Sequence, residues 1–225
     1  MNQRKRKRPS KARRHTRIQV YMKLGIVLLI LLTVVLGAVQ LLKPAKYSEK
    51  KGADIDAAKP AMDVQLLDVN EYSRPGLKSG KINGIVIHYT ANPGATAQQN
   101  RDYFQGLKDS HETKVSSHFI VGLDGEIIQC IPTWEIAYAS NKRNEDTVSM
   151  ECCHPDTSGK FNDQTYRSMV QLTAWLCKKF DLTEKDVIRH YDITGKICPK
   201  YFVDHENAWE AFRADVKTVL GKMEG

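Results

Sequence analysis

Apolar residues along the chain follow two spacings, one typical of buried strands and the other typical of amphipathic helices. Short apolar runs rich in β-branched residues predict strands at 84–90, 147–153 and 186–193. Between 116 and 132, two further strand-like runs meet at Asp124-Gly125, which predicts a hairpin because Gly accepts the positive φ of a tight turn. These segments supply the strands of one sheet.

Three longer segments have the composition or the spacing of helices. Residues 95–110 are helix-forming in composition, and 162–182 and 205–220 place apolar residues three or four positions apart. Asn162 or Asp163 suits the N-cap of the second helix, since either side chain can accept a backbone N–H. Strands and helices interleaved in this way predict an α/β domain with a single central mixed β-sheet flanked by helices.

An uncharged apolar stretch at 24–42 precedes this domain. As a helix it spans roughly 28 Å, close to the ~30 Å hydrocarbon core of a bilayer. The first 23 residues contain ten Lys or Arg and no acidic residue, so the N-terminus is predicted to be cytoplasmic. A cleaved signal peptide is the alternative, although its apolar region is usually only about 7–15 residues long. We predict one N-terminal transmembrane helix, retained as a signal anchor in the cell membrane.

The distribution of charge follows this division of the chain. We expect a basic cytoplasmic tail at 1–23, the anchor at 24–42, a polar linker at 43–63 and one extracytoplasmic domain at 64–225. Residues 1–43 hold 11 of the 34 basic residues and none of the 26 acidic ones, so the rest carries a net charge of about −3. The formal charge of +8 for the whole chain therefore comes from residues 1–43, and nucleic-acid binding is not predicted.

Three residues have the chemistry of a catalytic zinc site. His88 ends a predicted strand, and His190 and Cys198 stand eight residues apart in "RHYDITGKICP". Two imidazoles and a thiolate leave the fourth tetrahedral position of zinc open, as catalytic sites do. Taken singly, each residue is more often a core or surface His, or a small buried Cys.

Several segments together resemble one known family. They are "YSRPG", "GIVIHYTANPGATA", "VSSHFIVGLDGEIIQCIP", "VSMECC" and "RHYDITGKICP", in this order from about Gln65 to Leu220. The chain resembles the zinc-dependent N-acetylmuramoyl-L-alanine amidases of the type-2 family, which includes phage lysozyme-type amidases and peptidoglycan recognition proteins. The resemblance implies that fold, a peptidoglycan substrate and one Zn²⁺ held by His88, His190 and Cys198.

Glu151 and Lys196 are the candidates for acid–base and oxyanion roles. Alternation along the strand turns Glu151 away from its apolar neighbours, where a lone acid is costly unless it is paired or functional; a strand-edge Glu facing water is the alternative. In the resembling family either a hairpin Tyr or this Glu is present, and Ser117 occupies the Tyr position here. The resemblance also places Lys196 against the tetrahedral intermediate; otherwise it is a solvated loop Lys.

Other polar residues are less informative. Many family members carry a His in the segment where this chain has Tyr138, which puts a substrate contact there in doubt. We expect His118 to line the cleft and the remaining imidazoles, His111, His154 and His205, to lie on the surface. Pairing is left open for Cys130, Cys152, Cys153 and Cys177, since export permits disulfides but buried thiols fit equally well.

The sequence therefore predicts a membrane-anchored hydrolase that cuts the amide bond between N-acetylmuramic acid and L-alanine. A non-catalytic peptidoglycan-binding domain on the same tether is the main alternative, and a structural membrane protein is a third. Loss of the thiolate ligand commonly separates binding from catalytic members of the resembling family, so the presence of Cys198 favours catalysis.

Overall fold

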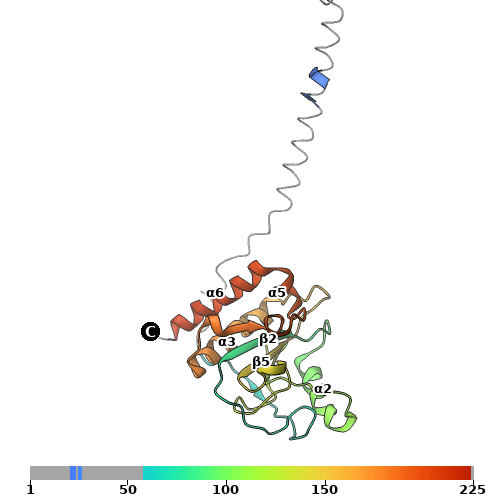
Figure 1. Ribbon diagram of the computed structural model, residues 1–225, viewed down its shortest axis with the longest axis vertical. Coiled ribbons are helices and arrows are strands. Elements are labelled where there is room, and N and C mark those ends of the chain that lie inside the picture. Colours follow the sequence, from blue (N-terminus) through green and yellow to red (C-terminus); the bar gives the residue numbers. More distant parts are fainter. Residues whose placement is uncertain (1–20, 24, 27–57, 224–225) are drawn as a thin grey trace, which may run out of the picture. The chain divides into compact units, whose positions relative to one another are not determined.

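The computed structural model describes residues 21–23, 25–26 and 58–223 (Figure 1). The chain divides into two compact units, Met1–Lys46 and Tyr47–Gly225. The second unit contains all the strands that the structure describes.

The predicted anchor at 24–42 lies outside the described residues except for residues 25–26. No helix within the described ranges has both the length and the apolar character needed to cross a bilayer. The predicted tail at 1–23 is described only at 21–23, and the linker at 43–63 only from residue 58.

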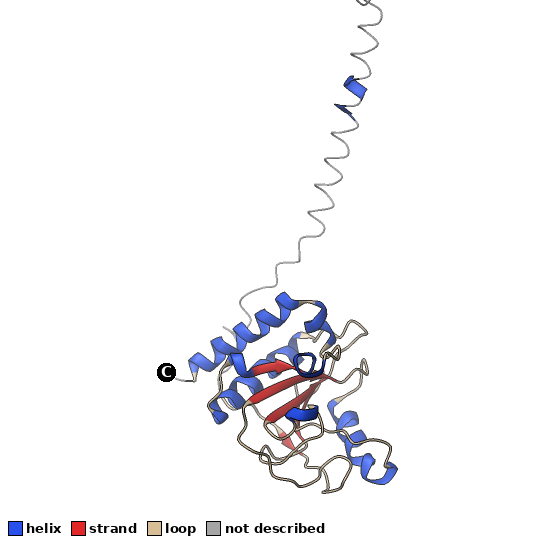
Figure 2. Cartoon of the chain, in the orientation of Figure 1, coloured by secondary structure: helices blue, strands red, loops and turns tan. Residues whose placement is uncertain are grey.

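A six-stranded mixed sheet forms the centre of the second unit (Figure 2). β3 and β4 pair antiparallel and every other neighbouring pair is parallel, which confirms the predicted mixed sheet. The strands, in their order across the sheet, are β1 (Asp63–Val64), β4 (Ile127–Gln129), β3 (Phe119–Val121), β5 (Thr147–Cys152), β2 (Gly84–Tyr89) and β6 (Val187–Arg189).

Helices cover both faces of the sheet. α3 (Asp163–Phe180) and α6 (Glu206–Lys222) pack with Ile87 and Met150 in the larger apolar core. α2 (Ala97–Ser110) packs with Ile120 on the other face. The short helices are η2 (Asn141–Arg143), η3 (Glu184–Asp186), α4 (His190–Thr194) and α5 (Lys200–Asp204). The predicted α/β architecture with flanking helices is confirmed.

Local capping explains where the long helices begin. Asn162 caps α3, because its Oδ1 accepts the N–H of Thr165 at 2.9 Å, and this selects Asn162 over Asp163. Thr96 and Gln99 form a capping box at the start of α2.

Two strand predictions need correction. The strand predicted at 186–193 ends at Arg189, because Asp192 accepts the Arg189 backbone N–H at 2.8 Å and turns the chain into α4. The two strands of the predicted hairpin are three residues each, and their loop is closed by a bond from the Gly122 N–H to the Glu126 carbonyl.

Candidate metal centre

Three segments bring the predicted metal ligands together at the carboxyl ends of the strands. His88 is the last but one residue of β2, and His190 opens α4 directly after the neighbouring strand β6. Cys198 follows the tight turn at Gly195, whose φ is +78°. The Tyr191 N–H donates to the Cys198 carbonyl at 2.9 Å and closes the loop between α4 and Cys198.

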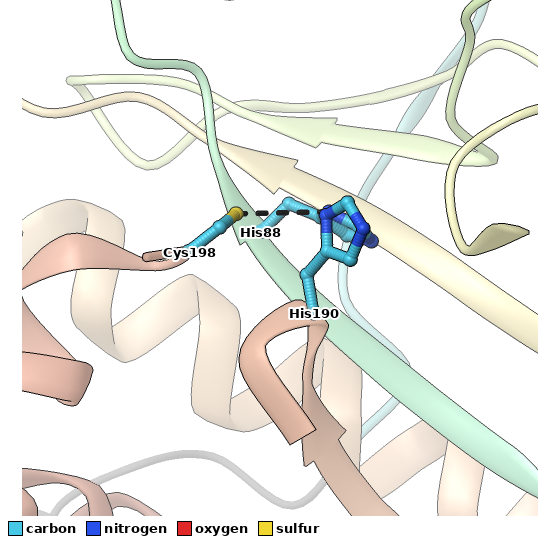
Figure 3. Close-up of side chains that lie close together, drawn as sticks. All are labelled: His88, His190 and Cys198. Atoms are coloured by element: carbon cyan, nitrogen blue, oxygen red, sulfur yellow. Dashed lines mark hydrogen bonds between the residues drawn. The ribbon is translucent and has the colours of Figure 1, made fainter. Parts of the chain in front are cut away.

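The ligand atoms of His88, His190 and Cys198 all lie within 4.8 Å of one another, and all three residues are buried (Figure 3). Cys198 Sγ is 3.8 Å from His88 Nδ1, and the two imidazole centroids are 4.7 Å apart in an edge-on arrangement. The cluster contains two nitrogen donors and one sulfur donor, the set that suits zinc.

Each imidazole has its second nitrogen fixed by a neighbouring loop. Ser140 Oγ lies 3.4 Å from His88 Nε2, and Asn141 Oδ1 accepts a hydrogen bond from His190 Nε2 at 3.0 Å. His190 Nδ1 is buried and has no hydrogen-bond partner. Ligating histidines usually hold their outer nitrogen in this way, which fixes the tautomer and turns the other lone pair inward. The residues therefore fit a metal ion.

Glu151 stands beside His88, since the two residues are opposite each other in the parallel register of β2 and β5. Its Oε1 lies 3.9 Å from His88 Nδ1, and its Oε2 is buried without a hydrogen-bond partner. Met150 and Cys152 point into the α3–α6 core, so the predicted orientation of Glu151 is confirmed. Burial raises the pKa of Glu151 to about 8, and the charge of Lys196 partly opposes this.

Lys196 is exposed at the edge of the cluster. Burial is the main cause that lowers the pKa of His88 and of His190, and the positive charge of Lys196 lowers both further. Lys196 is therefore close enough to act electrostatically on the buried groups, and solvent can still reach it.

The thiol of Cys198 is deeply placed. Burial raises its pKa to about 12, the charge of Glu151 adds to the rise, and the Tyr89 backbone N–H and Lys196 oppose it. Because the thiolate is the metal-binding form, metal binding has to release this proton.

The remaining imidazoles differ from expectation in two cases. His118 is 1% exposed, and both of its ring nitrogens are occupied, by the Ser149 backbone N–H and by the Glu135 carbonyl. It is part of the packed interior and does not line a cleft. The prediction that His154 lies on the surface is wrong, because its ring packs on Tyr89 and its Nδ1 lies 2.7 Å from the Asp156 carbonyl oxygen. All five cysteines are buried free thiols.

Sequence reasoning missed Ser140 and Asn141. Neither belongs to a ligand motif, and both lie at the start of η2, far from His88 and His190 along the chain. One signal was available: they follow Tyr138, where the chain departs from the resembling family.

A buried cluster of two imidazoles and one thiol, with a carboxyl group and a lysine beside it, is an arrangement typical of metal-dependent hydrolases. The family model described as N-acetylmuramoyl-L-alanine amidase matches residues 78–201. The chain belongs to this family.

Individual relatives agree with this assignment. The chain is 37% identical over 169 residues to N-acetylmuramoyl-L-alanine amidase CwlL of Bacillus licheniformis, a match over 69% of this chain and 46% of the relative. It is 34% identical to N-acetylmuramoyl-L-alanine amidase BlyA of Bacillus subtilis (strain 168), over 71% of this chain and 47% of the relative. The chain thus spans about half the length of these relatives.

Solved structures show the same fold. A mutant endolysin from Bacillus subtilis superposes with a TM-score of 0.60 at 26% identity, over 69% of this chain and 98% of that one. The catalytic domain of XlyA superposes with a TM-score of 0.60 at 25% identity, over 70% of this chain and 99% of that one.

Proposed function

We propose that the protein hydrolyses the amide bond between the lactyl group of N-acetylmuramic acid and L-alanine in peptidoglycan. The observation that carries this proposal is the inward-facing cluster of His88, His190 and Cys198 beside Glu151, in a chain of the amidase family. His88 Nδ1, His190 Nδ1 and Cys198 Sγ would hold one zinc ion. When bound, zinc lowers the pKa of a water ligand to about 7 and polarises a carbonyl oxygen.

Glu151 supplies the proton transfer. One carboxylate oxygen takes a proton from the attacking water, and the same group returns it to the amine of the departing L-alanine. A group that both takes up and returns a proton works best with a pKa near the operating pH, and burial raises the pKa of Glu151 from 4.5 to about 8. The water oxygen forms the new bond to the lactyl carbonyl carbon, the C–N bond breaks, and a carboxylate and an amine are left.

Lys196 would stabilise the charge that develops on the carbonyl oxygen. Its side chain is exposed in the absence of substrate, and a bound substrate would exclude water from it. A positioned donor at an oxyanion contributes on the order of 3 kcal/mol to lowering the barrier.

The location of the enzyme is also a proposal. The basic residues at 1–23 and the uncharged stretch at 24–42 support a single-pass anchor with a cytoplasmic N-terminus. The domain would then act on the cell wall from the extracytoplasmic side of the membrane.

Digestion of purified peptidoglycan tests the activity. Residues 44–225 with zinc should release stem peptides with a free L-alanine amine and leave glycan strands with free lactyl groups, as mass analysis would show. New reducing sugar ends would identify a glycosidase instead. Binding of peptidoglycan without release of either product would support a non-catalytic recognition domain.

A further inference from the structure

A pocket lies at the opposite edge of the sheet from His190. It has a volume of about 210 Å³ and is built around the edge strand β1, whereas His190 follows the other edge strand, β6. Its walls include Lys59, Trp134, Trp175 and Lys179. No proposed role of the metal centre uses these residues.

Two lysines share one aromatic ring in this pocket. Lys59 Nζ and Lys179 Nζ each lie 5.2 Å from the centroid of Trp175. Lys179 Nζ also donates a hydrogen bond to Thr133 Oγ1 at 3.1 Å, which holds the ammonium at the pocket wall.

Neither ammonium is neutralised within the part of the chain that the structure describes. No ion pair of Lys59 or Lys179 with a described carboxylate is present. Burial lowers the pKa of Lys179, and the charge of Lys59 lowers it further. Two cations that repel each other beside an apolar surface form a site that an anion would stabilise.

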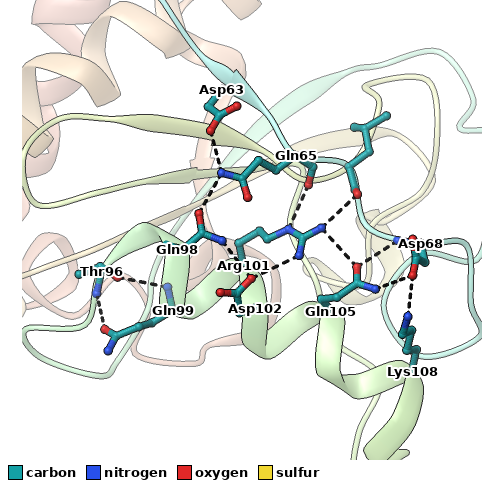
Figure 4. Close-up of polar contacts among 11 residues, drawn as sticks. Asp63, Gln65, Asp68, Thr96, Gln98, Gln99, Arg101, Asp102, Gln105 and Lys108 are labelled. Atoms are coloured by element: carbon teal, nitrogen blue, oxygen red, sulfur yellow. Dashed lines mark hydrogen bonds and ion pairs between the residues drawn. The ribbon is translucent and has the colours of Figure 1, made fainter.

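The pocket also contains an exposed indole ring, and the chain that follows β1 is fixed to α2. Trp134 is 64% exposed, and with the exposed Val64 and Leu66 it gives the pocket an apolar surface. On the side away from the pocket, Arg101 of α2 donates to the carbonyls of Gln65 and Leu66, both at 3.2 Å, and the Gln65 side chain also points toward α2 (Figure 4). Alternation along the chain turns Leu66 into the pocket.

The charge and shape of the pocket select a ligand with a ring and an acid group. The C–H edges of a sugar ring pack favourably on the electron-rich face of an indole, and a carboxylate pairs with ammonium groups. If the proposed function holds, amide hydrolysis creates this ligand, because every cleaved muramic acid regains a free lactyl carboxylate. The glycan strand then changes from amide-substituted to polyanionic.

We propose that the pocket formed by Lys59, Trp134, Trp175 and Lys179 binds glycan strands whose muramic acid residues carry free lactyl carboxylates. The ammonium groups pair with the carboxylate and Trp134 supports the sugar ring. Four inter-strand steps separate β1 from β2, roughly 19 Å across the sheet, and the pocket lies on the α3 face, whereas His88, next to Ile87 of the α3–α6 core, points to the other face. The pocket is therefore a binding site separate from the metal centre. The domain would remain on strands that it has already processed, next to uncleaved stems.

Binding of two matched glycans to the detergent-solubilised full chain tests this inference. The first is a stem-free strand of alternating N-acetylglucosamine and N-acetylmuramic acid, and the second is a neutral N-acetylglucosamine oligomer of the same length. We expect the acidic strand to bind at least fivefold tighter at low salt, and added salt to narrow the difference. Equal affinities would overturn the proposal.

Neighbouring lysines on α3 provide the control. Lys179→Gln should weaken binding of the acidic strand at least fivefold, whereas Lys178→Gln, the same change at the adjacent exposed position, should not. Trp134→Ala should weaken binding of both glycans. Identical affinities for the two lysine variants would refute the pocket as the site, even if the acidic strand is preferred.

Hydrolysis of a small muramoyl-peptide, measured in parallel, separates this inference from the proposed function. If the wild-type chain hydrolyses the substrate but does not bind the acidic strand selectively, the proposed glycan binding by the pocket is wrong and the amidase assignment stands. Selective binding that depends on Lys179, without hydrolysis, supports the pocket and contradicts the amidase assignment.

Discussion

His118 should make the stability of the domain depend on pH. Its Nδ1 accepts the Ser149 backbone N–H at 3.1 Å, and its Nε2–H donates to the Glu135 carbonyl at 2.9 Å. Only the neutral ring can make both bonds, and protonation of Nδ1 would break the first one. Burial lowers the pKa of His118 from 6.5 to about 4.

The sign and size of the effect follow from this shift. The unfolded chain takes up a proton near pH 6.5 and the folded one only near pH 4, so the stabilisation is complete above pH 6.5 and is lost as the pH falls toward 4. The full difference corresponds to about 3.4 kcal/mol, of which about 2 kcal/mol is lost between pH 7 and pH 5.

Urea unfolding of wild type and His118→Gln, in chelator so that metal release does not contribute, measures this difference. The variant is expected to be less stable at pH 7, because Gln replaces a fitted ring, but its free energy of unfolding should fall by about 2 kcal/mol less between pH 7 and pH 5. With a typical urea m-value, the urea midpoint of wild type should fall by about 1 M more than that of the variant between pH 7 and pH 5. His111→Gln, which removes an exposed imidazole, should behave like wild type.

Equal losses of stability in wild type and His118→Gln would refute the assignment of this pH dependence to His118. If His118→Gln does not fold, the ring nitrogen NMR shifts of wild-type His118 decide instead. They should remain those of a neutral ring at pH 5, and a protonated ring at that pH would contradict the hydrogen-bond arrangement.

The remaining predictions concern the metal centre and the membrane. Cys198→Ser should lower both zinc affinity and turnover, because a hydroxyl is a far poorer ligand than a thiolate; full zinc occupancy with full turnover would exclude Cys198 as a ligand. Glu151→Gln and Lys196→Met should keep zinc and fold but each lower kcat on the order of 10²-fold, and Glu151→Gln should also remove the acidic limb of the pH–rate profile. Asn141→Gly, which tolerates the local φ of +52°, should weaken zinc binding by about 10–100-fold in a chelator titration, and unchanged affinity would show that His190 needs no support. External protease should remove the domain from intact cells and leave the tail before 24–42 protected, whereas a freely secreted shortened form would indicate a cleaved signal.

Much of the fold could be predicted because its signals are local. β-branched runs mark β2 and β5, and the helical spacing of apolar residues marks α3 and α6. The orientation of Glu151 was also predictable, since alternation along a strand fixes the face of each side chain. Strand ends were less predictable. Whether Arg189 continues a strand or starts a helix depends on the Asp192 side chain and on Glu206 in α6, which accepts from Arg189 Nη1 at 2.6 Å.

The candidate site was predictable in its chemistry and not in its geometry. The residue types at 88, 190 and 198, together with the family resemblance, pointed to two imidazoles and a thiol. Their proximity depends on β6 lying next to β2, although almost a hundred residues separate these strands along the chain. The outer contacts from Ser140 and Asn141 depend on how one loop folds over that edge, and no periodic pattern encodes such a loop.

Buried polar atoms without partners give an independent indication of where function lies. Within the described residues there are four: Thr90 Oγ1, Glu151 Oε2, His154 Nε2 and His190 Nδ1. All four belong to residues at or just beyond the carboxyl ends of β2, β5 and β6. A buried polar group without a hydrogen bond costs about 1–3 kcal/mol, so a sequence selected for stability alone would remove it. These atoms gather at the carboxyl ends of the strands, close to His88 and Cys198. This indicates that this end of the sheet is organised for a ligand, and that the ligand-bound domain is the more stable form.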